Sequence, residues 1–150
     1  NLALELSKIP HVDSFKEASG NISQVAELMA KKPAHITVYS GNDDQTLPIL
    51  ALGGMGVICT CSNIIPSQMC EITDAFFAGN LELAREKQLA MLDMFAAMFC
   101  DCNPIPLKTA MNMAGLGAGE MRLPLVELTG KKRELVAQTL RRNGFTLVTE

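Results

Sequence analysis

Short strand-like runs alternate with helical stretches in the N-terminal part of the chain, and this alternation constrains the fold more than any other feature. Such alternation is typical of βα units that build a parallel sheet. We predict strands near residues 12–18, 36–40 and 56–61. The third run is apolar enough to be covered on both faces, as the strands of parallel sheets are.

The predicted helices are marked by polar or proline residues at their starts and by glycine after several of their ends. Between these marks, apolar residues recur at helical spacing. The predicted helices begin at Asn21, run from Thr46 to Leu52, from Pro66 to Gly79 and from Asn80 to Phe99, lie around Lys108 to Ala114, and run from Thr129 to Gly144.

The three predicted βα units are followed by a tail that is helical throughout. Three parallel strands alone would leave open edges. We therefore interpret them as the last three strands of a (β/α)₈ barrel, an α/β fold that takes about 250 residues. Residues 1–65 would supply the C-terminal part of the barrel, and residues 66–150 its last helix and a helical extension. The N-terminal half of the barrel would then be missing from this sequence.

The composition argues against several classes of function. The 150 residues, 48% of them hydrophobic, suffice for the core of one globular domain. A net charge of -3 argues against nucleic-acid binding, and the short basic cluster Lys131–Arg133 fits the solvated face of a helix. No apolar run reaches the roughly 18 residues that span a bilayer, and the N-terminus does not resemble a secretory signal. We expect a soluble cytoplasmic protein that contacts neither nucleic acid nor membrane.

The five cysteines include two Cys-x-Cys pairs, Cys59 with Cys61 and Cys100 with Cys102. Structural zinc sites more often use Cys-x-x-Cys, because two intervening residues let both thiolates face one ion. Residues two apart in a strand do share a face, so a metal site at Cys59 and Cys61 stays open as an alternative. We expect small buried thiols in a reducing compartment, and no metal.

Lys16 interrupts the first predicted strand. If Phe15 faces the surrounding helices, the period of two turns Ser14 and Lys16 toward the barrel axis. Desolvation in a barrel mouth disfavours the charged ammonium and lowers the pKa of a lysine, so a neutral amine is available to attack a ketone. The alternative is a strand-end lysine that reaches solvent or pairs with Glu17.

The loops that follow the three predicted strands carry small and polar residues. In a barrel these loops build the active site, because all strands point the same way. Small residues there let a ligand approach the backbone, whose N–H groups hold a carboxylate. The run Gly53–Gly56 precedes a strand, so it fails the order of a dinucleotide-binding loop. The loops are Ala18-Ser19-Gly20-Asn21, Ser40-Gly41-Asn42-Asp43 and Cys61-Ser62-Asn63.

Five segments stand out in order along nearly the whole chain, from about Pro10 to Phe145. They are Phe15-Lys16-Glu17-Ala18-Ser19-Gly20-Asn21, Ser40-Gly41-Asn42-Asp43, Gly53-Gly54-Met55-Gly56-Val57-Ile58 with Asn63 downstream, Asn103-Pro104-Ile105-Pro106-Leu107-Lys108 and Arg122-Leu123-Pro124-Leu125. Together they resemble the C-terminal half of the dihydrodipicolinate synthase and N-acetylneuraminate lyase family, with Asn42 where an aspartate is usual.

The resemblance implies a lyase of the class I aldolase type that needs no cofactor. In the family a lysine forms an imine with pyruvate, and the enamine attacks L-aspartate-4-semialdehyde to give 4-hydroxy-tetrahydrodipicolinate for diaminopimelate and lysine biosynthesis. By this resemblance Lys16 forms the imine, the backbone at Ile58 lies beside pyruvate, and Gly41 lines the pocket. The imine acts as an electron sink for the methyl carbon of pyruvate. Family members are usually homotetramers, so we expect a homo-oligomer.

The sequence also departs from the family. A Gly-Thr-Thr-Gly-Glu segment, the proton-relaying tyrosines and the arginine that receives the second substrate belong to the first half of the barrel, and nothing here matches them. Tyr39, the single tyrosine, falls in a different strand. The alternatives are therefore a related pyruvate-dependent aldolase, of the N-acetylneuraminate lyase or 2-keto-3-deoxygluconate aldolase type, or a half-barrel without catalytic activity.

Overall fold

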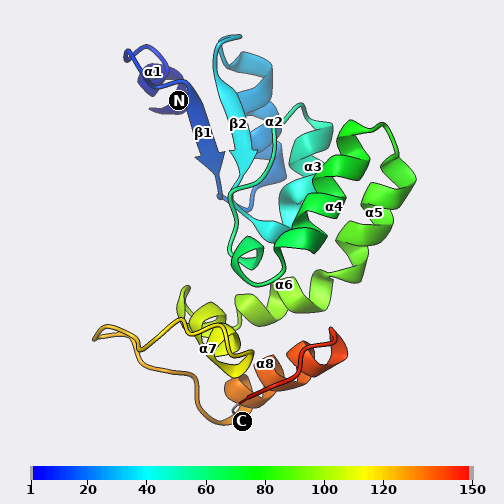
Figure 1. The fold of residues 1–150 in the computed structure, drawn as a ribbon. Helices are drawn as coiled ribbons and strands as arrows, with labels where there is room; N and C mark the ends of the chain where they lie inside the picture. The colour runs from blue at the N-terminus through cyan, green and yellow to red at the C-terminus, as the bar shows by residue number, and fades with distance from the viewer. Residues whose placement is uncertain (1, 149–150) are drawn as a thin grey trace. The chain divides into compact units, whose positions relative to one another are not determined.

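The computed structural model describes residues 2–148 and contains a short parallel sheet followed by a series of helices (Figure 1). The N-terminal elements alternate between strand and helix, as the sequence predicts. In chain order the elements are α1 (Leu2–Leu6), β1 (Ser14–Glu17), α2 (Ile22–Lys31), β2 (Thr37–Ser40), the 3₁₀ turn η1 (Asp43–Gln45), α3 (Thr46–Ala51), the 3₁₀ turn η2 (Cys61–Asn63), α4 (Pro66–Phe77), α5 (Leu81–Ala90), α6 (Leu92–Met98), α7 (Ile105–Met113) and α8 (Gly130–Arg142).

The chain forms two compact units. The first, here called the strand unit, holds the residues up to Cys59 together with Gln68–Gln88. The second, called the helical unit, holds Thr60–Ser67 and the chain from Leu89 onward. The predicted division into residues 1–65 and 66–150 concerned a barrel and its extension, and it stays a prediction.

Strands β1 and β2 pair in parallel, with Phe15 opposite Val38 and Lys16 opposite Tyr39. Figure 1 shows the two arrows side by side and pointing the same way. This pairing confirms the α/β class. Within residues 2–148 the sheet has these two strands, so its closure into a (β/α)₈ barrel stays a proposal.

The prediction of a full third strand near residues 56–61 is wrong. Val57 makes a single parallel bridge to Ser40, flanked by hydrogen bonds from the Met55 amide to the Val38 carbonyl (2.9 Å) and from the Ile58 amide to the Ser40 carbonyl (2.8 Å). The ladder stops there because β2 ends at Ser40 and offers no further backbone partner. The chain then turns into η2 instead of continuing as a strand.

One face of the sheet is covered by helices. Val38 is fully buried in a cluster with Val25 and Leu28 of α2 and Ile49 of α3. Because side chains alternate along a strand and paired positions share a face, Phe15 lies on the same face as its partner Val38. Lys16 and Tyr39 therefore lie together on the opposite face, as predicted for Lys16.

The predicted helix starts at two asparagines are confirmed. The Asn21 side chain accepts a hydrogen bond from the Gln24 amide (3.1 Å), and Asn80 accepts one from the Leu83 amide (3.1 Å). Such caps typically contribute about 1 kcal/mol each. The helix predicted from Asn80 to Phe99 is divided, because Met91 has φ −98° and ψ 3°, outside the helical region, and separates α5 from α6.

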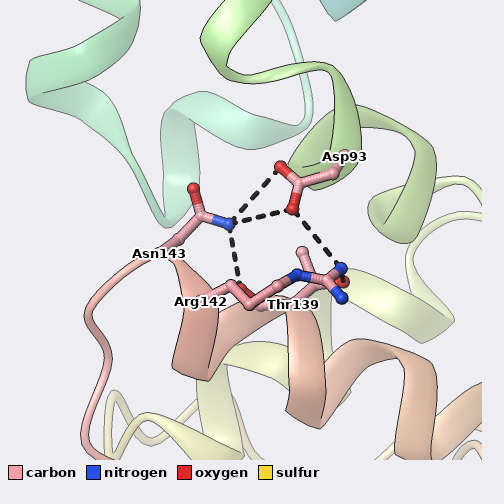
Figure 2. Close-up of polar contacts among 4 residues, drawn as sticks. All are labelled: Asp93, Thr139, Arg142 and Asn143. Atoms are coloured by element: carbon pink, nitrogen blue, oxygen red, sulfur yellow. Dashed lines mark hydrogen bonds and ion pairs between the residues drawn. The ribbon is translucent and has the colours of Figure 1, made fainter.

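The helical unit packs α6, α7 and α8 against one another. The apolar residues between these helices are fully buried: Met94, Met98, Met113, Val136 and Leu140. Figure 2 shows the polar contacts that join α6 to the end of α8. Asp93 accepts from Arg142 Nη2 and from Asn143 Nδ2, each at 3.4 Å, and Arg142 also donates to Thr139 Oγ1 at 3.1 Å. A carboxylate in the first turn of α6 and a guanidinium in the last turn of α8 both suit the helix dipoles.

Two side chains of α7 hold the connection from Ala114 to Thr129. The Asn112 amide makes a pair of hydrogen bonds with the backbone of Gly119 (3.0 and 3.1 Å), and Lys108 Nζ donates to the Glu120 carbonyl. Lys108 and Asn112 are one helical turn apart and so share a face of α7. They fix the middle of a connection that has no regular secondary structure of its own.

Candidate functional site

Lys16 is the third residue of β1 and lies on the face of the sheet that no helix of the strand unit covers. Its side chain is exposed within residues 2–148. The desolvation predicted for this amine therefore needs cover from outside the described residues. This exposure also fits the alternative of a strand-end lysine that reaches solvent.

Gly41 lies directly against Lys16. A Cβ atom at position 41 would be 2.7 Å from the Ala18 Cβ, 3.0 Å from the Glu17 carbonyl oxygen and 3.1 Å from the Lys16 Cε. The Gly41 amide also donates a 2.6 Å hydrogen bond to the Glu17 carbonyl. Close backbone approach of this kind requires glycine. The structure thus brings together two of the three predicted site residues.

The loops that follow β1 and β2 are tied to each other. Gln45 Nε2 donates to the Gly20 carbonyl at 2.9 Å, and within the second loop Ser40 Oγ donates to the Asn42 carbonyl at 2.7 Å. These bonds fix the two loops side by side at the end of the sheet where Lys16 lies. Sequence analysis predicted both loops but gave Gln45 no role.

Glu17 does not pair with Lys16 in the structure. Its carboxylate accepts a 2.6 Å hydrogen bond from the Ser19 amide, and strand alternation places it on the other face of β1. Lys16 therefore forms no ion pair with its sequence neighbour Glu17.

Ile58 lies beside the loop that follows β2. Its side chain is 50% exposed, and its amide is held by the Ser40 carbonyl, one residue before Gly41. Lys16, Gly41 and Ile58 thus lie on three adjoining backbone segments of the strand unit. The third predicted loop, Cys61–Asn63, forms η2 in the helical unit, where Asn63 Nδ2 donates to the Thr60 carbonyl at 3.0 Å.

Sequence analysis missed Gln88, a polar side chain that is only 4% exposed. Gln88 follows the fully buried Ala84 by one helical turn on α5. A glutamine one turn from a small apolar residue is the signal that could have found it, because glutamine is seldom buried without partners for its amide.

The cysteines do not cluster with other ligands. Across residues 2–148, no group of three or more histidine, cysteine, aspartate or glutamate side chains could hold a metal ion. Cys59 and Cys61 are buried, as expected for small core thiols, whereas Cys70 and Cys102 are exposed. Burial raises the pKa of the Cys100 thiol, and the Lys132 ammonium offsets part of that rise. In the same described range no helix has the length and hydrophobicity needed to cross a membrane.

With the Lys16 and Gly41 geometry in view, comparison with known proteins decides the family. The model of the dihydrodipicolinate synthetase family matches residues 3–143. The chain belongs to this family. A curated relative, the 4-hydroxy-tetrahydrodipicolinate synthase of Caldicellulosiruptor bescii, is 48% identical over 143 residues, which are 95% of this chain and 48% of the relative.

Solved structures of dihydrodipicolinate synthases have the same fold as the chain. The enzyme from Aquifex aeolicus is 31% identical and gives a TM-score of 0.92 over 99% of this chain and 50% of that one. The chloride-inhibited enzyme from Acinetobacter baumannii, solved as a complex with pyruvate, is 30% identical and gives 0.89 over 96% and 50%. The chain spans about half the length of the relatives that it matches.

Proposed function

We propose that this chain carries the imine-forming lysine of a 4-hydroxy-tetrahydrodipicolinate synthase, with Lys16 as the nucleophile. The observation that carries the proposal is the close fit of Gly41 against the Lys16 Cε, at the end of a parallel sheet, in a member of the dihydrodipicolinate synthetase family. The half-exposed Ile58 would then lie beside the bound keto acid.

The proposed chemistry begins with addition of the neutral Lys16 amine to the keto carbon of pyruvate and loss of water. The resulting iminium withdraws electrons, so a proton leaves the methyl carbon and an enamine forms. The enamine carbon attacks the aldehyde of L-aspartate-4-semialdehyde. The amino group of the adduct then displaces the Lys16 amine and closes the ring of 4-hydroxy-tetrahydrodipicolinate. No cofactor takes part, because the imine itself serves as the electron sink.

The proton transfers in this scheme need partners that the described residues do not supply. Among residues 2–148 the Lys16 face carries Tyr39, whose ring lies 3.4 to 3.5 Å from where a Cβ on Gly56 would be. We propose that the proton relay and the site for the second substrate come from the remaining strands of a (β/α)₈ barrel. Within the described chain the outer edge of β1 pairs with no strand, so it is available for that sheet to continue. A homo-oligomer, usual in the family, is part of the same proposal.

The test is covalent trapping. The protein is incubated with pyruvate, reduced with borohydride and digested, and the modified peptide is mapped by mass spectrometry. We expect a reduced pyruvyl adduct on Lys16 and none on Lys31 or Lys87, which are surface lysines paired with carboxylates. A Lys16→Arg variant keeps the positive charge and should take no label. An adduct spread evenly over the surface lysines, or none on a folded protein, would contradict the proposal for this chain.

A second measurement identifies the acceptor. Protein preloaded with pyruvate is offered L-aspartate-4-semialdehyde, N-acetylmannosamine or D-glyceraldehyde, and the products are separated. In a protein that also contains the remaining strands of the barrel, turnover is expected with the semialdehyde and with neither of the two sugars. Turnover with a sugar aldehyde instead would assign the chain to one of the related pyruvate aldolases.

A further inference from the structure

Gln88 is a buried amide, both ends of which bind the backbone of the segment that follows β2. Its Nε2 donates to the Asp43 carbonyl at 3.1 Å, and its Oε1 accepts from the Leu47 amide at 3.4 Å. The Leu47 amide lies in the first turn of α3, where backbone N–H groups have no partner within the helix. Gln88 therefore spans η1 from its first residue to the start of the next helix.

A glutamine at a buried position of α5 needs an explanation. Its buried positions are Ala84 and Gln88, and an apolar residue at position 88 would pack without any need for hydrogen-bond partners. A buried amide is costly unless both its polar groups are satisfied. Gln88 satisfies both on one short stretch of backbone, so its position specifies the conformation of that stretch.

The backbone stretch that Gln88 binds begins only two residues after Gly41, which lies beside Lys16, the nucleophile of the proposed function. Gly41 lies two residues before Asp43, and a Cβ atom there would be 3.1 Å from the Lys16 Cε. Gln45, between the two Gln88 contacts, binds the loop after β1. The Asp43 carbonyl also accepts hydrogen bonds from Thr46 Oγ1, at 2.9 Å, and from the Thr46 backbone amide. The Gln88 bonds therefore add a contact from α5 to the bonds that this stretch makes with β1 and its loop, through Gly41 and Gln45, and to those within the stretch itself, through Thr46.

We propose that Gln88 is a positioning residue for imine formation, because it holds the Gly41–Leu47 stretch against Lys16 from the opposite side. The proposal rests on the proposed function of Lys16. In this proposal Gln88 does not contact the substrate. It acts on Lys16 through the Gly41–Leu47 stretch. A displacement of about 1 Å in such a support can lower a reaction rate by about 100-fold.

The test compares Gln88→Met, which keeps the volume but loses both bonds, with Gln88→Glu, which keeps an acceptor for the Leu47 amide. Gln138→Met is the matched control, because Gln138 is an exposed glutamine on a helix whose side chain donates to the neighbouring Glu134. Each variant is given pyruvate over a range of concentrations, and the rate constant and final extent of Lys16 labelling are measured separately. Hydrogen exchange of the Gly41 and Leu47 amides is followed in the same proteins.

For Gln88→Met we expect the rate constant of labelling at saturating pyruvate to fall about 10- to 100-fold, with an unchanged final extent. Exchange at Leu47, whose amide loses its acceptor, should rise about tenfold or more, and exchange at Gly41 should rise as well because the stretch that carries it is less firmly held. Gln88→Glu should recover part of the rate, and Gln138→Met all of it. A purely structural role would lower the extent of labelling, through unfolded protein, and leave the rate constant of the folded fraction unchanged.

Unchanged labelling and unchanged exchange in Gln88→Met would overturn the proposal, as would faster exchange without a slower rate constant. If the unsubstituted chain takes no label, the proposed function fails on its own account. The exchange of the Gly41 amide still decides the role of Gln88 in that case, because it does not depend on pyruvate. If the Gly41 amide exchanges no faster in Gln88→Met than in Gln138→Met, the positioning role of Gln88 is rejected.

Discussion

The contacts within the strand unit differ from the contacts within the helical unit. In the helical unit, α6, α7 and α8 bury their apolar residues between one another and add polar contacts at the surface, such as those of Asp93. In the strand unit, helices cover one face of the sheet, and Lys16 and Tyr39 lie on the face that they leave open. The loops at the end of the sheet where Lys16 lies are held by hydrogen bonds between side chains and backbone, from Gln45 to the loop after β1 and from Gln88 of α5 to the stretch after β2. Apolar packing stabilises both units, and in the strand unit hydrogen bonds between loops also shape the candidate site.

The largest expected effect concerns the packing of the helical unit. Leu140 of α8 is fully buried, so Leu140→Ala removes a core side chain and leaves a cavity. We expect the free energy of unfolding of the α8 amides to fall by about 2–5 kcal/mol. Hydrogen exchange resolved by residue measures this loss.

The same experiment tests how separate the two units are. If they are held independently, the α2 amides of the strand unit keep their protection and Lys16 keeps its labelling rate in Leu140→Ala. An equal loss of protection in α2 would show that the two units unfold together. They could then not be regarded as stabilised independently.

A smaller effect is expected from Gly41→Ala, which adds a methyl group where the Ala18 Cβ would be 2.7 Å away. Overpacking of this kind costs about 1–3 kcal/mol, and the added atom also displaces the Lys16 side chain. We expect slower trapping of pyruvate at Lys16 as well as lower stability, measured by borohydride trapping and by denaturant unfolding.

Gly79→Ala is the matched control for this substitution. Gly79 has φ +79° and nothing within 4 Å of an added Cβ, so alanine there is strained but meets no neighbour. It should lower stability and leave the labelling rate of Lys16 unchanged. Equal slowing in both variants would mean that Gly41 has no special relation to Lys16.

The smallest effect is expected at the surface pair of Asp101 and Lys132, whose Oδ2 and Nζ lie 2.7 Å apart. The hydrogen bond from Lys132, with a second from the Cys102 amide, lowers the pKa of the Asp101 carboxyl below its ordinary value. A lowered folded-state pKa contributes stability above the ordinary carboxyl pKa of about 3.9 and loses it as the pH falls through the lowered value.

Asp101→Asn should therefore reduce the melting temperature slightly at pH 7 and make no difference once Asp101 is protonated in the native protein. Exposed pairs are also screened, so added salt should shrink the difference at pH 7. Melting curves of both proteins across the acid range measure it. A difference that grows toward low pH would have the wrong sign for this pair.

The parts of the fold and site that could be predicted from the sequence depend on local signals. The caps at Asn21 and Asn80, the strand around Lys16 and the glycine beside it are all marked by residue type and spacing. The family resemblance then pointed to Lys16 and Gly41, which the structure places in contact. What was missed depends on partners far along the chain. The spacing from Ala84 marks Gln88 as a candidate for burial, but no local pattern identifies its partners, which lie more than 40 residues before it.

The wrong predictions have the same origin. The run after Gly56 is apolar and β-branched, but a strand also needs a partner over several residues, and β2 ends at Ser40. The long helix predicted from Asn80 satisfies every local rule up to Phe99, yet Met91 leaves the helical conformation between two separately packed segments. In both cases tertiary contacts override a correct local propensity.

The ties from Lys108 and Asn112 divide the connection between α7 and α8 into two shorter loops with fixed ends. Extra residues inserted after Glu120 would lengthen the second loop alone, and each doubling of a flexible loop adds only about 0.6 kcal/mol of closure entropy. Leu123, 85% exposed, lies in that second loop and bears little of the packing. A short insertion directly after Glu120 should therefore cost little stability and leave the two bonds from α7 intact.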